Sequence, residues 1–273
     1  MEVQNNYSVL MSVYHKESPE NLKCSLKSMF SQTIVTNDFV LMCDGPLTED
    51  LEKVITDYQK MYQGILNVYR FDENMGLGVA LRKGVLNCKN EIIARMDSDD
   101  IAVTSRCEKQ LLEINKGYDI VGSNIDEFIN AVDNIVATRI VPEKHEDILQ
   151  FIKKRNPFNH PSVMYRKSQV LEAGNYRNEY RLEDYYLWVD MLGCGCVGYN
   201  IQENLVRMRS TEDMYKRRSG KLLIKSLLKL RKYMLQNNII NIFEFTTVTF
   251  VQTILAIIPN GLRSLLYRKI LRG

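Results

Sequence analysis

The first hundred residues alternate short β-rich runs with helical stretches, and this alternation constrains the fold more than any other feature of the chain. A β-rich run at residues 7–13 is followed by Ser18-Pro19, a helix cap and a first-turn proline, and then by apolar residues at helical spacing. The same unit recurs, with predicted strands at residues 39–42, 65–71 and 91–96 and predicted helices at residues 48–62 and 78–86. Strands that alternate with helices need crossover connections, so we expect a mainly parallel sheet flanked by helices.

The second half of the chain is less regular. Its pattern predicts strands at residues 119–126, 135–141 and 162–165 and helices at residues 146–154, 185–192 and 215–236. There is no internal repeat and no low-complexity linker. We therefore expect one α/β domain over residues 1–212 and a basic helical C-terminal region over residues 213–273.

Composition narrows the class of protein. A chain of 273 residues with 45% hydrophobic and 25% charged residues is typical of a soluble globular protein rather than a disordered or multi-span membrane protein. The six cysteines show no zinc or redox spacing, and the N-terminus lacks a secretory signal, so we expect a reduced, cytoplasmic chain.

Charge is distributed unevenly along the chain. Residues 206–273 hold 14 Lys/Arg and 3 Asp/Glu, whereas residues 1–205 hold 22 and 30. The C-terminal region is therefore suited to an anionic surface, and the rest of the chain is not. We expect no nucleic-acid partner.

The loops that follow the four predicted strands carry the unusual polar residues. In open parallel sheets, ligands bind beyond the carboxyl ends of the strands. These loops are residues 14–17 (YHKE), 43–46 (CDGP), 72–76 (DENMG) and 97–100 (DSDD). No P-loop is present, and the Gly76-Leu77-Gly78 segment lacks the third glycine of a dinucleotide-binding fingerprint.

The acidic loop, residues 97–100, places three carboxylates so close together that they repel one another unless a cation lies between them. A calcium EF-hand is excluded because Ile101 and Ala102 stand where a ligand and a glycine are required. Magnesium or manganese therefore remains as the candidate cation. The alternative is a solvated turn that caps the next helix through Thr104 or Ser105.

Six segments together resemble the family 2 glycosyltransferases of the GT-A fold, which move a sugar from a nucleotide-diphosphate donor to an acceptor hydroxyl. They are VLMSVYHKE (residues 9–17), VLMCDGP (40–46), NMGLGVALRKG (74–84), ARMDSDDIAVTSRCEKQ (94–110), FNHPSVMYRK (158–167) and LEDYYLWVDML (182–192). The segments occur in the order and spacing of the family and cover most of the chain. The resemblance implies the GT-A fold, a Rossmann-like, mainly parallel sheet flanked by helices.

On the donor side, the resemblance implies that Asp44 binds the uracil or ribose and that Tyr14 and Glu17 line the base pocket. A buried carboxylate such as Asp44 can accept hydrogen bonds from both groups. The alternatives are an Asx turn before Gly45 for Asp44 and a helix-capping role for Glu17.

The resemblance also implies that Asn74, Gly76 and Arg82 contact the donor, with Arg82 and Lys83 approaching its phosphates. The alternative for the two basic residues is an exposed helical face.

Asp97 and Asp99 match the metal-binding acids of the family, and Asp100 is a further candidate ligand of Mn²⁺ or Mg²⁺. The metal would neutralise the diphosphate as the glycosidic bond breaks. Arg106 matches a recurrent arginine of the family, whereas Thr104 stands where proline is common.

Glu183 and Asp184 match the acceptor-side acids, with Asp184 as the general base and inversion of configuration as the outcome. The alternative is that both acids supply negative charge to the first turn of the helix that follows. His160 is expected to shape the acceptor and donor-sugar side, or to be structural.

The basic segment RMRSTEDMYKRRSG (residues 207–220) resembles an arginine-rich region of bacterial exopolysaccharide and O-antigen glycosyltransferases. Arg209 with Arg217 or Arg218 is expected to close over the donor diphosphate as a flap. The alternative is a basic patch that faces a membrane.

The C-terminal region contains an uncharged run, residues 245–258, that is shorter than the roughly 20 residues needed to span a bilayer. With the basic residues that follow, it is typical of an interfacial helix pair on an anionic leaflet. The alternative is a helix that packs on the domain or on a second copy.

The sequence therefore predicts an inverting, metal-dependent glycosyltransferase, peripheral at the inner face of a bacterial membrane, that extends a lipid-linked saccharide. One rival is a sugar-phosphate nucleotidyltransferase, which would need a glycine-rich, lysine-containing loop in place of residues 14–17. Another is a non-catalytic nucleotide-sugar sensor or membrane scaffold. The sugar, the acceptor, the linkage and the oligomeric state stay open.

Overall fold

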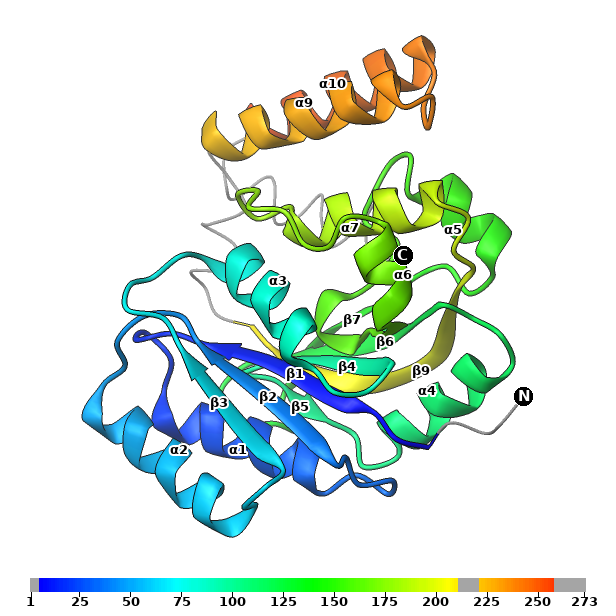
Figure 1. Ribbon diagram of the computed structural model, residues 1–273. Helices are drawn as coiled ribbons and strands as arrows, with labels where there is room; N and C mark the ends of the chain where they lie inside the picture. The colour runs from blue at the N-terminus through cyan, green and yellow to red at the C-terminus, as the bar shows by residue number, and fades with distance from the viewer. Residues whose placement is uncertain (1–4, 211–220, 258–273) are drawn as a thin grey trace.

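A mixed β-sheet organises the chain, and helices cover both of its faces (Figure 1). The computed structural model describes residues 5–210 and 221–257, and within these ranges the sheet has nine strands. Their order is β3-β2-β1-β4-β8-β6-β9-β5, with β7 paired to β6.

The N-terminal half of the sheet is parallel, as predicted. Its strands are β1 (Ser8–Val13), β2 (Asp38–Cys43), β3 (Leu66–Arg70) and β4 (Ile92–Asp97). The crossover helices are α1 (Pro19–Phe30), α2 (Glu49–Met61) and α3 (Leu77–Asn87). Parallel pairing of β1 with both β2 and β4 confirms the fold expected from the strand and helix alternation.

Strand β1 shows why the first apolar runs are continuous. Val9 and Met11 belong to the core beneath α1 and α2, whereas Leu10 belongs to the core beneath α3 and helix α7 (Glu183–Gly193). Successive side chains of a strand point to opposite faces. A parallel strand covered on both faces therefore needs apolar residues at every position.

The C-terminal half of the sheet is mostly antiparallel. Its strands are β5 (Ile101–Ala102), β6 (Ile120–Phe128), β7 (Ile135–Arg139), β8 (Met164–Arg166) and β9 (Gly198–Arg209). Its helices are α4 (Arg106–Asn115), α5 (His145–Phe151), α6 (Lys167–Glu172), α7 and the 3-10 helix η1 (His160–Ser162). The predicted strand pair is confirmed as β6 and β7.

The structure of this half differs from the sequence prediction in two places. The strand predicted at residues 162–165 starts later, because η1 occupies its first residue and β8 begins at Met164. The pattern also gives no sign of β9. Its middle residues, Gln202, Glu203 and Asn204, are exposed, and its register against β6 shifts there, so a periodic apolar pattern is missing.

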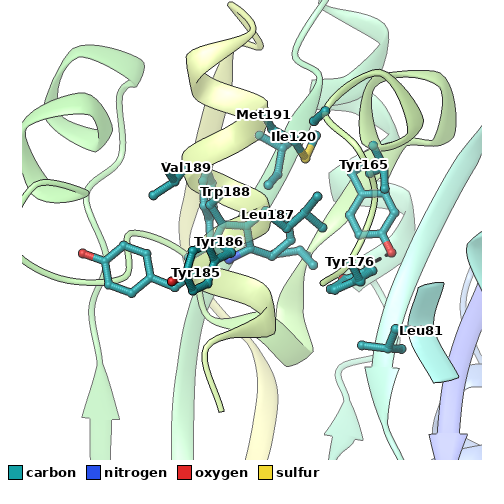
Figure 2. Close-up of a cluster of buried hydrophobic side chains, with 14 of the residues drawn as sticks. Leu81, Ile120, Tyr165, Tyr176, Tyr185, Tyr186, Leu187, Trp188, Val189 and Met191 are labelled. Atoms are coloured by element: carbon teal, nitrogen blue, oxygen red, sulfur yellow. Dashed lines mark hydrogen bonds between the residues drawn. The ribbon is translucent and has the colours of Figure 1, made fainter. Parts of the chain in front are cut away.

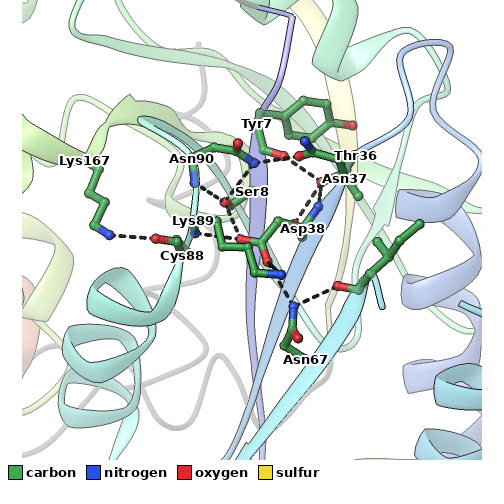
Figure 3. A network of polar contacts seen from close by, with 11 residues as sticks. Tyr7, Ser8, Thr36, Asn37, Asp38, Asn67, Cys88, Lys89, Asn90 and Lys167 are labelled. Atoms are coloured by element: carbon green, nitrogen blue, oxygen red, sulfur yellow. Dashed lines mark hydrogen bonds and ion pairs between the residues drawn. The ribbon is translucent and has the colours of Figure 1, made fainter. Parts of the chain in front are cut away.

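Asp38 ties the amino ends of the parallel strands together (Figure 3). Its buried carboxylate accepts hydrogen bonds from Ser8 Oγ (2.6 Å), the Lys89 amide (2.8 Å) and Asn67 Nδ2 (3.0 Å). A buried carboxylate is stable when its oxygens are hydrogen-bonded in this way. The polar network stabilises the end of the sheet formed by the amino ends of the strands, which lies opposite the loops that carry the predicted site.

Helix α7 is buried around Trp188 (Figure 2). The indole ring lies 5.6 Å from the ring of Phe158, 6.0 Å from that of His160 and 6.2 Å from that of Tyr165. Close packing of this kind restricts the rotation and position of the helix. It therefore fixes the direction of the first turn of α7, where the two predicted acceptor-side acids stand.

The C-terminal region contributes α9 (Lys221–Gln236) and α10 (Ile242–Ile257), which lie above α7 in Figure 1. Leu230 and Met234 of α9 belong to the same core as α7. In the described ranges, no helix is both long enough and apolar enough to cross a bilayer. The predicted boundary between residues 212 and 213 lies outside the described residues and stays a prediction.

Candidate active site

The acidic loop after β4 meets the end of β9. The Arg209 amide donates to Asp100 Oδ1 (2.8 Å), and Arg209 Nε donates to the Asp99 carbonyl (3.2 Å). The guanidinium also lies over the Phe128 ring, 4.6 Å from its centroid. Two predicted metal ligands and one predicted donor residue are thus brought together from segments about a hundred residues apart.

Glu17 contacts this loop and the start of α1 at the same time. Its Oε2 accepts a hydrogen bond from Ser98 Oγ (2.7 Å), and its Oε1 accepts one from the Ser18 amide (2.8 Å). The two interpretations of Glu17, a site residue and a capping residue, are therefore compatible.

Asp44 joins the loops after β2 and β3. Its carboxylate accepts hydrogen bonds from the amides of Met75 (2.7 Å) and Gly76 (3.0 Å), and Asn74 Nδ2 donates to its carbonyl (3.1 Å). Gly45 has a φ of 90°, and a Cβ there would lie 2.8 Å from the Asn74 amide nitrogen, so only glycine fits. Asp44, Asn74 and Gly76 form one unit, and their contact with the donor stays a prediction.

Two other predicted donor residues stand apart from these contacts. Arg82 is exposed on α3, and Tyr14 is partly buried with its ring against His15. Arg217 and Arg218 lie outside the described residues.

Arg95 is a central residue that the motifs do not single out. It is 1% exposed, and its guanidinium grips Asp97 through both nitrogens, with Nη1 to Oδ2 at 2.7 Å and Nη2 to Oδ1 at 2.5 Å. A two-pronged contact of this kind fixes the position and the orientation of a carboxylate. The available signal was an arginine two residues before Asp97 in an apolar strand, since residues i and i+2 share a face.

Arg95 also links Asp97 to the acids at the start of α7. Burial raises the pKa of Glu183, as do the charges of Asp184 and Asp97, whereas Arg95 lowers it. The charge of Asp97 therefore acts on Glu183, and the charge of Arg95 acts on both acids at the start of α7.

Asp184 is partly exposed and is held by two hydrogen bonds. Asn156 Nδ2 donates to its Oδ2 (2.6 Å), and the Tyr185 amide donates to its Oδ1 (2.7 Å). Burial raises the pKa of Asp184, and these two donors and the Arg95 charge oppose that rise. Asn156 is a second site residue that no motif indicated, because it lies between predicted elements.

His160 lies on the same side of the site. Its Nε2 is 3.1 Å from the Tyr176 hydroxyl, and its ring packs against Trp188. Burial and the charge of Arg95 lower its pKa well below the usual range, so the ring is neutral near pH 7. Its expected role in shaping the acceptor and donor-sugar side stays a prediction.

Arg106 has a structural role. It is fully buried, and its Nη2 donates to the Arg95 carbonyl (2.7 Å) and to the Val163 carbonyl (3.3 Å). It therefore braces β4 directly beneath the acidic loop.

The acidic loop has the chemistry that a hard divalent cation requires. Burial first, and the charges of Asp97 and Glu17 next, raise the pKa of Asp99 to about 7. Asp100 Oδ2 is buried and has no hydrogen-bond partner among the described residues. A nearby cation would relieve both conditions.

The described part of the chain contains no ready-made cluster of three or more His, Cys, Asp or Glu residues around a metal position. Magnesium-type sites usually combine one or two carboxylates with substrate phosphates. The residues present fit such an ion, and the metal stays a prediction.

Three comparisons relate the chain to known proteins. The model of the family described as "Glycosyl transferase family 2" matches residues 8–174. The chain is 35% identical over 271 residues to the UDP-Gal:alpha-D-GlcNAc-diphosphoundecaprenol beta-1,3-galactosyltransferase of Escherichia coli, covering 97% of this chain and 96% of that protein. It is 34% identical to the amylovoran biosynthesis glycosyltransferase AmsE of Erwinia amylovora, covering 98% and 100%.

Solved structures show the same fold. The chain superimposes on residues 1–349 of S. aureus TarS in complex with UDP-GlcNAc with a TM-score of 0.66 at 14% identity, covering 89% of this chain and 70% of that one. At this identity the likeness concerns the fold, which is the one expected from the loops and strands.

Proposed function

Because this chain belongs to glycosyl transferase family 2, we propose that it transfers a sugar from a UDP-linked donor to a polyprenyl-diphosphate-linked saccharide, in bacterial surface polysaccharide synthesis. The names of the two relatives support this choice. One acts on a diphosphoundecaprenol-linked acceptor with UDP-Gal, and the other serves amylovoran biosynthesis.

The observation that carries the proposal is the contact of Arg95 with Asp97, together with the effect of its charge on the two acids of α7. Its guanidinium grips Asp97 at the donor side, and its charge lowers the pKa values of Glu183 and Asp184 at the acceptor side. A transferase must hold a diphosphate donor and an acceptor hydroxyl within reach of each other. The effect of one arginine on both groups of acids supports a shared site of this kind.

The Asp184 carboxylate is the proposed general base. It removes the proton of the acceptor hydroxyl while that oxygen attacks the anomeric carbon opposite the departing nucleotide, which inverts the configuration. Asn156 and the Tyr185 amide hold the two oxygens of the base. Together with these two donors, the Arg95 charge opposes the rise of the Asp184 pKa that burial causes.

Asp99 and Asp100, with Asp97, would hold Mn²⁺ or Mg²⁺, which when bound supplies positive charge to the diphosphate leaving group. Arg209, whose amide and Nε already contact this loop, is placed to add a guanidinium on the same side.

A turnover assay tests the proposed function. We expect the full chain to release UDP from one member of a panel of UDP-sugars, in the presence of a GlcNAc-diphosphate-lipid, and to lengthen that lipid by one sugar. A sensor would bind a nucleotide sugar without releasing UDP. A nucleotidyltransferase would instead release pyrophosphate from UTP and a sugar phosphate.

The metal proposal predicts the effect of Asp99→Asn. We expect the affinity for UDP in the presence of Mn²⁺ to fall about tenfold or more, because a charged ligand is lost from a partly buried position. Calorimetric titration with UDP measures this, and Mn²⁺ binding is followed separately by electron paramagnetic resonance. Asp57→Asn, an exposed change on α2, is the matched control. Equal affinities for the variant and the natural chain would refute the role of Asp99.

We also propose that α10 attaches the protein to an anionic membrane surface. Three apolar side chains of this helix are widely exposed, namely Ile242 (64%), Phe243 (75%) and Phe250 (66%). The sequence that follows carries Arg263 and Arg268 among leucines. Exposed aromatic residues beside basic ones favour an interfacial position.

Vesicle flotation tests this attachment. We expect Phe243→Ser combined with Phe250→Ser to weaken binding to anionic vesicles about tenfold or more, since burial of each phenylalanine is worth about 1.5–3 kcal/mol. Met61→Ser, another exposed apolar residue, is the control. Failure of the natural chain to float with vesicles at low salt would refute the attachment. A dimer that depends on the same phenylalanines would assign the face to a second copy instead.

A further inference from the structure

We propose that Arg231 of helix α9 positions the catalytic base, through the turn that holds Asn156 against Asp184. The inference rests on the proposed function, in which Asp184 takes the acceptor proton. It gives the C-terminal helix a part in the reaction that is separate from membrane attachment.

Arg231 is fully buried and directs its guanidinium at the turn that follows α5. Its Nη1 donates to the Lys153 carbonyl and its Nη2 to the Lys154 carbonyl, both at 2.8 Å. These residues are 78 and 77 positions away in the sequence. One side chain of α9 thus fastens two successive carbonyls of a turn that has no regular structure of its own.

The same turn leads directly to the base. Asn156, two residues after Lys154, donates its side-chain amide to Asp184 Oδ2 at 2.6 Å and accepts a hydrogen bond from the Phe158 amide at 3.2 Å. A shift of the turn would move the Asn156 amide away from the carboxylate. The path from α9 to the reacting group therefore consists of the Arg231 hydrogen bonds, the backbone from Lys154 to Asn156 and the hydrogen bond of Asn156 to Asp184.

A second contact reaches the neighbour of the base. Arg231 Nη2 lies 3.2 Å from the Tyr185 hydroxyl, which donates to the Ile152 carbonyl at 2.5 Å. The guanidinium carbon is 5.4 Å from the Tyr185 ring centroid. The amide of Tyr185 in turn donates to Asp184 Oδ1. Both hydrogen bonds to the base thus come from residues whose surroundings Arg231 holds.

Apolar packing alone does not explain a guanidinium at this place. Leu230 and Met234 already pack α9 against the core, and burial of a charged group costs free energy that an apolar side chain would not. What an apolar side chain cannot supply is hydrogen bonds to the two carbonyls. The arginine therefore serves to place the turn, and through it the base.

Arg231→Met in the full chain tests the proposal. Methionine fills a similar volume but donates no hydrogen bond, so we expect kcat to fall about a hundredfold, as misplacement of a reacting group by about 1 Å does. The calorimetric affinity for UDP should be unchanged, because the hydrogen bonds described above for Asp44, Asp99 and Arg209 involve no residue of α9. Arg231→Lys should recover part of kcat. Lys232→Met, an exposed change at the next position, is the control and should leave kcat unaltered.

A double-mutant cycle with Asn156→Ala separates positioning from general damage. If Arg231 acts through the turn, the double variant has a kcat within a few-fold of that of Asn156→Ala alone, the remaining loss coming from the Tyr185 contact. Multiplied losses, or an unchanged kcat in Arg231→Met, would overturn the proposal. If the methionine variant does not fold, Arg231→Lys takes its place in the cycle.

Asp184→Asn in the same assay separates this inference from the function it rests on. Full turnover in that variant contradicts the proposed base. An inactive Asp184→Asn together with independent effects of Arg231 and Asn156 contradicts the positioning role alone.

Discussion

Replacing Asp184 by Asn should abolish sugar transfer, with kcat reduced about a thousandfold or more. The amide has nearly the shape of the carboxylate but cannot accept a proton, so the attacking oxygen keeps its hydrogen. Binding of UDP should persist, because the donor-side contacts of Asp44, Asp99 and Arg209 belong to other loops.

Initial rates with the donor and acceptor from the turnover assay give kcat, and calorimetry gives the affinity for UDP. The matched control is Asp57→Asn, which changes the same chemical group at an exposed position of α2. Turnover within a few-fold of the natural chain would show that Asp184 is not the base.

The pH dependence of kcat offers a second measurement of the same role. Burial raises the pKa of Asp184, and Asn156, the Tyr185 amide and Arg95 limit the rise. Because the base must be ionised, kcat should fall as the pH drops through this raised pKa, at a higher pH than for an ordinary aspartate. The neighbouring Glu183, whose pKa is also raised by burial and by Asp184, makes the fall reflect the pair rather than one residue.

Arg95→Met should damage both the donor side and the acceptor side. The variant leaves Asp97 without its two hydrogen bonds, and we expect the free energy of unfolding to fall by about 2 kcal/mol, less than for a fully buried pair because Asp97 is 33% exposed. We expect kcat/KM for the donor to fall about a hundredfold, because the acidic loop loses the contact that orients it.

Thermal or urea unfolding measures the first effect, and steady-state kinetics measure the second. Arg95→Lys keeps the charge but not the two-pronged contact, so it should lie between the natural chain and the methionine variant. If Arg95→Met kept both its stability and its kcat/KM, Arg95 would only occupy space in the core. The proposed connection between the two groups of acids would then be wrong.

The parallel half of the fold is predictable because the sequence patterns that specify its strands and helices are local. Each of the first strands is a short apolar run, each helix has apolar residues at helical spacing, and a proline begins the first helix. The same locality made the acidic loop and the Glu183-Asp184 pair visible, since their residues are adjacent in the chain. Strand β9 escaped because its central residues are polar and exposed, so its pairing with β6 depends on a distant strand.

The partners of the reacting groups were not predictable for the same reason. Arg95 looks like an interruption of an apolar strand until Asp97 is seen on the same face, with the acids of α7 nearby. Asn156 lies between predicted elements, and Arg231 looks like one more cation of a basic helix. In each case folding brings the contacting atoms together, and no sequence motif marks the contact.

The sequence by itself determined the alternating strands and helices of the N-terminal half, the family, and which acids stand at the ends of strands and at the start of a helix. Only the tertiary structure decided what surrounds those acids: a buried guanidinium at Asp97, an amide at Asp184, and α9 behind the turn that carries the amide. The physical reason is the sequence distance over which the two kinds of interaction act. Backbone preference and apolar periodicity act between near neighbours, whereas hydrogen bonds and burial act between atoms that folding brings together from distant parts of the chain.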